Sequence, residues 1–145
     1  MVDVRAKGAR GEYAVRDLLR QNTGHTFERV PASGALPYLK GDLHIPNAAN
    51  RFCIEVKNYA ESPLNDKIFT SKTNNLVQWW DKIRIQAKNC KKEPLLFFKY
   101  NRSKIYVVTE IKPLNLEKYL YISWLGCYIM LAEEWIKKEK ITYVT

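Results

Sequence analysis

The chain has 145 residues, a length that suits one domain built on a single hydrophobic core. Its 46% hydrophobic and 27% charged residues are ordinary for a globular protein. An excess of 24 Lys and Arg over 15 Asp and Glu leaves a formal net charge of +9. That excess favours a polyanionic partner, nucleic acid before membrane, over a merely basic protein without such a partner.

The cysteines and the apolar stretches indicate a compartment. Cys53, Cys90 and Cys127 are far apart and lack metal-ligand spacing, so we expect buried thiols in a reducing environment. Residues 1–20 are charged throughout, unlike a signal peptide, and the most apolar stretch, 119–131, is too short to span a bilayer. We expect an intracellular protein with no membrane partner, in the cytoplasm of a prokaryote or, if viral, of its host cell.

Residues 4–20 have the spacing of an amphipathic helix. The apolar stripe consists of Val4, Gly8, Gly11, Val15, Leu18 and Leu19. Its two glycines weaken helix propensity, which close approach to a strand or to a DNA backbone would offset. Glu12 borders this stripe, and a solvated helical glutamate is the alternative to a functional one. A plausible phosphate-contacting face surrounds it: Arg5, Lys7, Arg10, Arg16 and Arg20.

Residues 22–24, Asn-Thr-Gly, are natural helix stops. Residues 26–30 form the next predicted strand, with Phe27 pointing inward. Residues 31–40 contain two prolines and no periodicity, which predicts a loop directly before Asp42. Loops beside a site often carry function.

Residues 41–58 are the centre of the sequence, predicted as two short strands joined by a turn at 46–50. Side chains alternate across a strand. In the second strand Phe52, Ile54 and Val56 therefore face the core. The opposite face carries Cys53, Glu55 and Lys57.

Asp42 starts the first of these strands, with Leu43 and Ile45 directed into the core. If the two strands pair, the carboxylates of Asp42 and Glu55 converge on one point. Two converging carboxylates suit a hard divalent cation such as Mg²⁺. Lys57 beside them is a point charge for a phosphate or for a coordinated water. The pattern predicts a phosphodiesterase site.

The middle of the chain is predicted as a loop followed by a helix. Residues 59–75 are polar and mostly loop, and residues 76–90 form the second helix. Its apolar stripe consists of Leu76, Trp80, Ile83, Ala87 and Cys90. Trp79 falls off that stripe, so we expect it to be exposed, for a dimer contact or for DNA.

The last third of the chain is predicted to extend the sheet. Residues 94–100 and 104–110 form a hairpin whose run at 95–98 is apolar on both faces, as in a central strand between helices. Residues 113–125 are less clear and could hold a short helix. A strand at 128–131 and a helix at 132–140 follow. We expect an α/β fold in which a mixed central sheet is flanked by helices.

Glu12, Gly41-Asp42 and Glu55-Val56-Lys57 resemble the motif of the PD-(D/E)XK, restriction-endonuclease-like nuclease superfamily. Within it the chain is most similar to the archaeal-type, Hjc-like Holliday junction resolvases. The resemblance covers about the first 60 residues, and includes Arg29 and Ser33-Gly34; the usual proline before the first aspartate is here Gly41. It implies a restriction-endonuclease-like core in one nuclease domain over residues 1–145.

The resemblance also implies residue roles. Asp42 and Glu55 would bind Mg²⁺, for which Mn²⁺ substitutes, with the backbone carbonyl of Val56 as a third ligand. Lys57 would position the attacking water, and Glu12 would complete the catalytic set. Arg29 and Ser33 would contact DNA beside Lys7 and Arg10. Arg29 could equally be an ion-pair partner of Glu28 or Glu12.

The implied activity is Mg²⁺-dependent cleavage of four-way DNA junctions. Two matched cuts in a two-fold symmetric junction favour a homodimer, for which the aromatic stretch 119–128 is an interface candidate, although ordinary core explains it equally well. The alternatives are another endonuclease of this superfamily (nicking, flap or duplex-cutting) and a non-catalytic basic DNA-binding module. His44 shares the strand face of Asp42 but is expected to be a partly buried, satisfied histidine, and His25 to be exposed.

Overall fold

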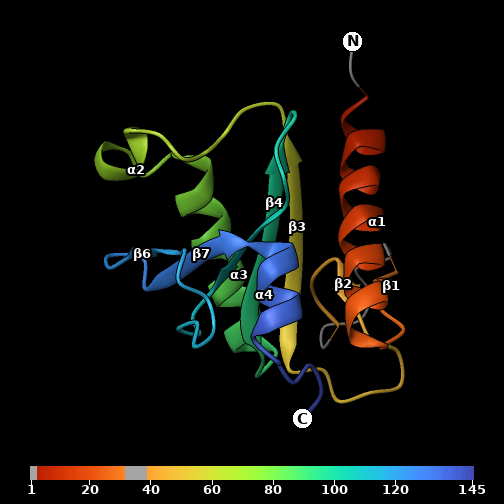
Figure 1. The fold of residues 1–145 in the computed structure, drawn as a ribbon. Coiled ribbons are helices and arrows are strands. Elements are labelled where there is room, and N and C mark those ends of the chain that lie inside the picture. The colour runs from red at the N-terminus through yellow and green to blue at the C-terminus, as the bar shows by residue number, and fades with distance from the viewer. Residues whose placement is uncertain (1–2, 32–38) are drawn as a thin grey trace.

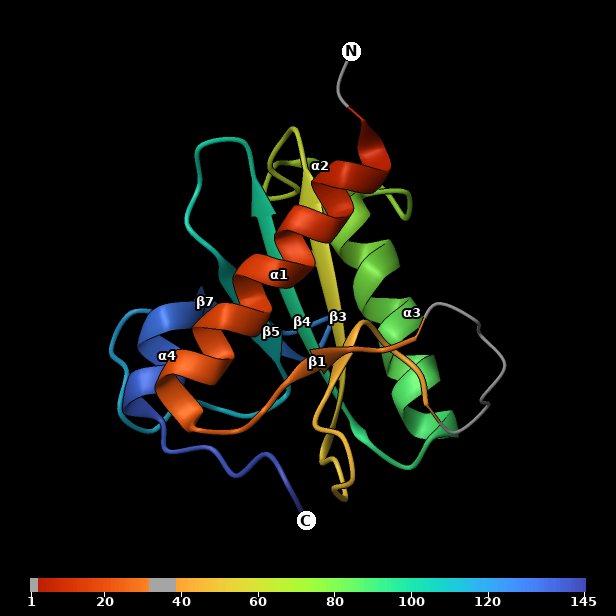
Figure 2. The same cartoon turned by 90° about the vertical axis from the view of Figure 1, so that its right-hand side faces the viewer.

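A computed structural model of the chain describes residues 3–31 and 39–145. Within them one mixed sheet has seven strands in the order β1-β2-β3-β4-β5-β7-β6, and helices cover both of its faces (Figures 1 and 2). This confirms the predicted fold class. The elements are α1 (Val4–Thr23), β1 (Glu28–Arg29), β2 (Leu43–His44), β3 (Phe52–Tyr59), α2 (Lys67–Thr70), α3 (Asn75–Asn89), β4 (Glu93–Tyr100), β5 (Tyr106–Thr109), β6 (Leu120–Ile122), β7 (Cys127–Leu131) and α4 (Ala132–Lys138).

The two longest strands, β3 and β4, lie side by side at the centre of the sheet. They are parallel, in register from Phe52 opposite Glu93 to Tyr59 opposite Tyr100, and α3 forms the crossover between them. β4 and β5 pair antiparallel, which confirms the predicted hairpin. On the other side, β2 pairs antiparallel with β3 only where Leu43 lies opposite Ile54, so most of that β3 edge is free of β2.

The sheet separates two apolar clusters. On one face α1 and α4 pack against inward residues of β3 such as Ile54 and Val56, and on the other α3 packs beside Cys53. Residues 95–98 of β4 are all buried and alternate between the clusters, as expected for a central strand. The inward and outward residues of β3 are therefore those that strand alternation predicts.

The predicted first helix is longer than expected and its buried stripe is shorter. Asp3 caps α1 by accepting from the backbone N–H groups of Arg5 and Ala6, and Gly24 ends the helix in a left-handed conformation. Val4, assigned to the apolar stripe, is 81% exposed, because the buried residues of α1 begin only at Gly11. None of the helices within residues 3–31 and 39–145 has both the length and the apolarity needed to cross a membrane.

Two aromatic side chains are placed differently from the prediction. Trp79 is only 8% exposed, because its ring lies against Tyr59 and Phe98 with centroids 4.9 and 6.1 Å away. The buried face of α3 is thus wider than one narrow stripe. His25, expected at the surface, is half-buried, and its ring packs edge-on against Phe27 and Tyr143.

The unclear stretch 113–125 forms no helix. It is irregular until β6, which pairs antiparallel with β7, and β7 pairs antiparallel with β5. The tail therefore adds two strands to the sheet before α4 packs on the α1 face. The stretch 59–75 is mostly loop, as predicted, with the single-turn helix α2 inside it. None of the three cysteines is in a disulfide: Cys53 and Cys127 are buried, and Cys90 is half-buried.

We expect Gly11→Ala to destabilise the fold. A Cβ at Gly11 would lie 2.8 Å from the Cβ of Asn58 on β3, so α1 would have to move away from the strand, at a cost of about 1–3 kcal/mol. Gly8→Ala is the matched control, because a Cβ there would have no atom within 4 Å apart from its chain neighbours and the backbone of its own helix. Better helix propensity should stabilise that variant by up to about 1 kcal/mol. Urea unfolding measures both, and equal stability of Gly11→Ala and wild type would contradict the close packing.

Candidate active site

Gly41 brings Asp42 directly against β3. Its φ of 96° disfavours any L side chain, and a Cβ there would lie 2.6 Å from the backbone oxygen of Ile54. The backbone N–H of Asp42 donates to that same oxygen at 2.6 Å, and the Val56 N–H donates to Asp42 Oδ2 at 2.7 Å. A glycine before the aspartate is thus a requirement of this backbone geometry, in place of the usual proline.

Glu55 lies on β3 between the two residues whose backbone groups hold Asp42. Burial, the charge of Asp42 and a hydrogen bond between the two carboxyl groups raise the pKa of Glu55 to about 8, although Lys57 and Lys82 act in the opposite direction. Without a bound cation, the Glu55 carboxyl therefore stays mostly protonated at neutral pH. The predicted convergence of Asp42 and Glu55 is present.

Lys57 and Glu12 interact through their charges with the Asp42–Glu55 pair. Lys57 is half-buried on the same face of β3 as Glu55, and its charge acts on both Glu55 and Glu12. Burial raises the pKa of the Glu12 carboxyl, with a smaller contribution from the charge of Asp42, while Arg29 opposes the shift. Asp42 and Lys57 each interact with both Glu12 and Glu55, so the four predicted catalytic residues form one group, although they come from α1, the residue before β2, and β3.

Arg29 pairs with Glu12. Its Nε donates to Glu12 Oε1 at 3.0 Å, and its Nη1 donates to the Tyr13 hydroxyl at 3.1 Å. The guanidinium also lies over the Tyr13 ring, 4.9 Å from the centroid. Of the two roles left open for Arg29, the structure contains the ion pair with Glu12, and a DNA contact stays a prediction.

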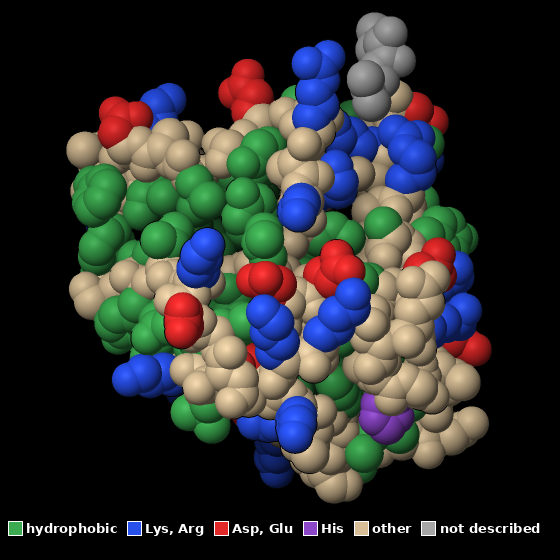
Figure 3. All heavy atoms as spheres, in the orientation of Figure 1, with side chains coloured by type: hydrophobic (Ala, Val, Ile, Leu, Met, Phe, Trp, Pro, Cys, Tyr) green, Lys and Arg blue, Asp and Glu red, His purple; other side chains and the backbone are tan. Residues whose placement is uncertain are grey.

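Two predicted DNA-contacting residues lie on the first half of α1. The Lys7 ammonium donates to the side-chain oxygen of Asn101 in the β4–β5 turn, and the Lys7 carbonyl accepts from Asn58 Nδ2 at 3.0 Å. Arg10 is exposed on the same helix. In Figure 3, Lys and Arg side chains gather at this end of the sheet, over the start of α1. Ser33 lies outside the described residues.

Lys82 is a further residue of the site region, which the sequence did not single out. It lies on α3, which packs over the Glu55 face of β3, with Trp79 one turn earlier against Tyr59. Its charge lowers the pKa of Glu55. The i, i+3 spacing from Trp79 to Lys82 could have signalled this position, had Trp79 been recognised as buried.

Histidine is not part of this group. His44 is half-buried, and its pKa is lowered by burial, with Glu28 and Lys92 as its charged neighbours. The expected partly buried histidine is therefore present, and neither Asp42 nor Glu55 contributes to its pKa shift.

The acid pair fits a divalent cation by its chemistry. Among residues 3–31 and 39–145, no group of three or more His, Cys, Asp or Glu residues is arranged to hold a metal ion. Two carboxylates are nevertheless a sufficient protein contribution for Mg²⁺, which commonly takes its other ligands from water and substrate phosphate. Burial is the main cause of the raised pKa of Glu55, and the charge of Asp42 adds to it, so a bound cation would favour the ionised form of Glu55.

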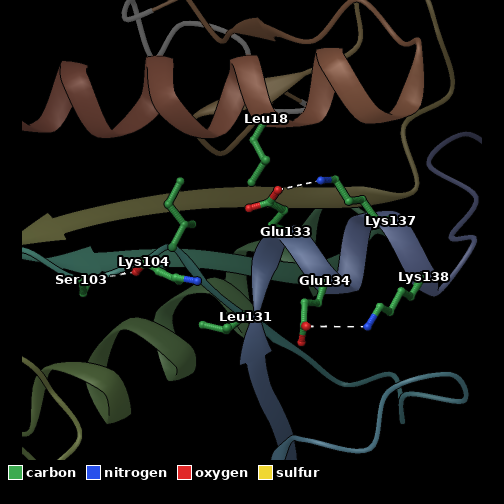
Figure 4. A pocket seen from close by; sticks show the side chains of 9 residues that line it. Leu18, Ser103, Lys104, Leu131, Glu133, Glu134, Lys137 and Lys138 are labelled. Atoms are coloured by element: carbon green, nitrogen blue, oxygen red, sulfur yellow. Dashed lines mark hydrogen bonds and ion pairs between the residues drawn. The ribbon is translucent and has the colours of Figure 1, made fainter.

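A separate hollow elsewhere in the molecule has no such group of unpaired carboxylates. A hollow of about 550 Å³ lies between α1 and α4 (Figure 4). Its glutamates are already paired, Glu133 with Lys137 at 2.6 Å and Glu134 with Lys138 at 3.6 Å. Such helical i, i+4 pairs are ordinary surface features, so this hollow is a poor candidate for chemistry.

The family model described as "Phage putative PDDEXK endonuclease" matches residues 3–141. The chain belongs to this family. It is therefore an endonuclease of the PD-(D/E)XK type with DNA as its substrate, and such nucleases typically use a divalent metal. The resemblance of Glu12, Asp42 and Glu55-Val56-Lys57 to that motif agrees with this membership.

Two further comparisons accompany this PD-(D/E)XK assignment. "Protein D14" of Escherichia phage T5 is 39% identical over 107 residues, which are 70% of this chain and 67% of that protein. Among solved structures, Archaeoglobus fulgidus Hjc, a Holliday junction resolvase from an archaeal hyperthermophile, is similar over 86% of this chain and 88% of the other. Its sequence identity is 19% and the TM-score is 0.47.

We expect the acid pair to make stability depend on pH in metal-free buffer. The folded-state pKa of Glu55, about 8, exceeds its ordinary value of 4.5, so the folded protein retains a proton that the unfolded chain loses. This contribution to stability is present below about pH 4.5 and is lost as pH rises toward 8. Glu55→Gln cannot ionise, so its free energy of unfolding should rise relative to wild type across this interval. Urea unfolding in EDTA at several pH values measures the difference, and a constant difference would contradict the raised pKa of Glu55.

Proposed function

We propose that this endonuclease is a Mg²⁺-dependent, structure-selective enzyme that resolves four-way DNA junctions by paired phosphodiester hydrolysis, with one nuclease domain over residues 1–145. The observation that carries the proposal is the Asp42–Glu55 carboxyl pair beside Lys57, in a chain of the PD-(D/E)XK family. Clustered carboxylates repel DNA unless a cation is present. A protein that only bound DNA would have no use for them.

Asp42, Glu55 and the Val56 carbonyl would hold the Mg²⁺ or Mn²⁺ ion. When bound, the cation supplies a Lewis acid for the scissile phosphate. Lys57 would orient the attacking water and offset the negative charge that develops on the phosphate oxygens. Glu12 would complete the site from α1, and its ion pair with Arg29 keeps that carboxylate close to the other groups.

DNA would be held through its backbone. Lys7 and Arg10 on α1, Arg29 on β1, and Ser33 would contact phosphates, which position a duplex without reading its sequence. A four-way junction is roughly two-fold symmetric, so two identical sites in a homodimer would make the two matched cuts. The remaining alternatives, another substrate for the same nuclease or binding without catalysis, differ from this proposal in their products.

A substrate panel tests the proposal. Labelled four-way junction, flap and plain duplex are each incubated with the protein, with Mg²⁺, with Mn²⁺ and with EDTA. Paired cuts in the junction that require a divalent metal, with slower or no cutting of the duplex, are expected. Preferential cutting of flap or duplex would replace the junction by that substrate, and binding without cleavage in either metal would reject the nuclease mechanism.

We expect Asp42→Asn and Glu55→Gln each to reduce cleavage at least about a thousandfold, because several kcal/mol of metal-dependent transition-state stabilisation are lost. Junction binding in EDTA should be unchanged or tighter, since each substitution removes a negative charge facing phosphate. Glu117→Gln, an exposed carboxylate, is the control and should cleave as wild type does. Gel-based cleavage and binding assays measure both properties. Undiminished cleavage by either site variant would refute the assigned site.

A further inference from the structure

A cluster of apolar side chains is exposed where α2 lies beside β6. Phe69 is 76% exposed, Trp124 54%, Tyr121 53% and Leu120 56%. The rings of Phe69 and Trp124 stack at a slant, with centroids 5.1 Å apart, so together they form one aromatic projection. Figure 3 shows apolar side chains gathered on this side of the molecule, away from the basic end of the sheet.

A groove of about 520 Å³ lies in this surface. None of its lining residues is charged. They are Leu64, Asn65, Ile68, Phe69, Leu120, Tyr121, Ile122 and Trp124, which we call the β6 surface. The aromatic projection and the groove therefore belong to the same surface, the arrangement that lets one surface fit a second copy of itself.

β6 is also the outermost strand of the sheet on this side. Proteins usually protect such an edge with lysine, proline or a covering segment. The residues of β6 are Leu120, Tyr121 and Ile122, so the strand itself carries neither charge nor proline. β6 is short, with three residues, which limits pairing, but an uncharged apolar edge strand of this length can still pair with another strand through its free backbone groups.

We propose that the β6 surface joins two copies of this chain around a two-fold axis, with β6 of one copy antiparallel to β6 of the second and each Phe69–Trp124 pair seated in the groove of the other copy. The inference takes the homodimer from the proposed function and assigns its contact surface. Of the aromatic stretch 119–128, it assigns the exposed Tyr121 and Trp124 to the interface, whereas Ile122 lines the groove with only 7% exposure and Leu125 is buried in the core.

Charge favours a second copy over nucleic acid. DNA requires cations on the protein surface, and the β6 surface has none among its lining residues. Two chains that each carry +9 repel one another over most of their surface. Contact through an uncharged surface brings the fewest like charges together.

The arrangement would also place the two active sites on the same side of the dimer. A two-fold axis perpendicular to an antiparallel pair of edge strands continues the sheet and keeps the α3 faces of both copies on the same side. Glu55 and Lys57 face that side. From β3 to β6 there are four strand spacings, so the two β3 strands would be nine spacings apart, roughly 43 Å in a flat sheet. One branched DNA could then reach both sites.

Sedimentation velocity over a range of concentrations tests the interface. Wild type should be a dimer, and Trp124→Glu and Phe69→Glu should weaken dimerisation at least about thirtyfold, the loss expected for a central aromatic at an interface. Ile85→Glu is the matched control, because Ile85 is 62% exposed on α3 and lies outside the β6 surface. It should remain a dimer, and circular dichroism should show all variants folded.

Tryptophan fluorescence gives an independent measurement. Trp124 is the exposed tryptophan, whereas Trp79, Trp80 and Trp135 are buried. Emission should therefore shift to shorter wavelength, and acrylamide quenching should decrease, as wild type dimerises. No such change is expected for Phe69→Glu over the same concentrations.

A monomeric wild type, or glutamate variants that dimerise as wild type does, would overturn the inference, whatever other protein might bind the surface. Cleavage assays separate this outcome from failure of the proposed function. Monomeric Trp124→Glu keeps its site and should still nick junctions while losing paired cuts. A wild type that dimerises through this surface but cleaves no junction would leave the interface in place and reject the junction activity.

Discussion

The attachment of Asp42 to β3 is the interaction on which the rest of the site depends. Its N–H donates to the Ile54 carbonyl, and its carboxylate accepts from the Val56 N–H, so backbone and side chain are both held by the strand that carries Glu55 and Lys57. Only a residue without a Cβ fits at position 41 at this distance. The acid pair is therefore set by main-chain geometry, which long side chains could not hold as rigidly.

Without a bound cation, the close approach of Asp42 and Glu55 lowers the stability of the folded protein when both are ionised. Glu55 is half-buried beside the carboxyl of Asp42, so burial first and the charge of Asp42 second raise the pKa of Glu55, and a bound cation would oppose both effects. A site organised for stability would replace one acid by an amide. The presence of both acids beside Lys57, with Glu12 held nearby by Arg29, is explained if their negative charges take part in phosphodiester cleavage.

Features that depend on neighbouring residues in the sequence, such as the two faces of a strand, were predicted correctly. Alternation along β3 placed Glu55 and Lys57 opposite Ile54 and Val56, and this required no knowledge of the rest of the fold. The position of Trp79 could not be obtained in this way, because its burial depends on Tyr59 and Phe98 from two strands. The Glu12–Arg29 pair likewise joins α1 to β1, so its existence depends on tertiary packing and both roles of Arg29 fitted the sequence.

The same sheet separates two different kinds of surface. Its β3 edge, left free where β2 diverges, carries the acid pair and lies near the basic first half of α1, whereas its β6 edge is uncharged and aromatic. Three strands with mostly buried side chains, β4, β5 and β7, lie between these two edges, so the two surfaces do not overlap. The proposed contact at β6 would therefore join two copies without covering the residues that we propose contact DNA. One short chain thus carries both a net charge of +9 and an apolar C-terminal stretch, because the basic residues of α1 and the apolar residues of β6 lie near opposite edges of the sheet.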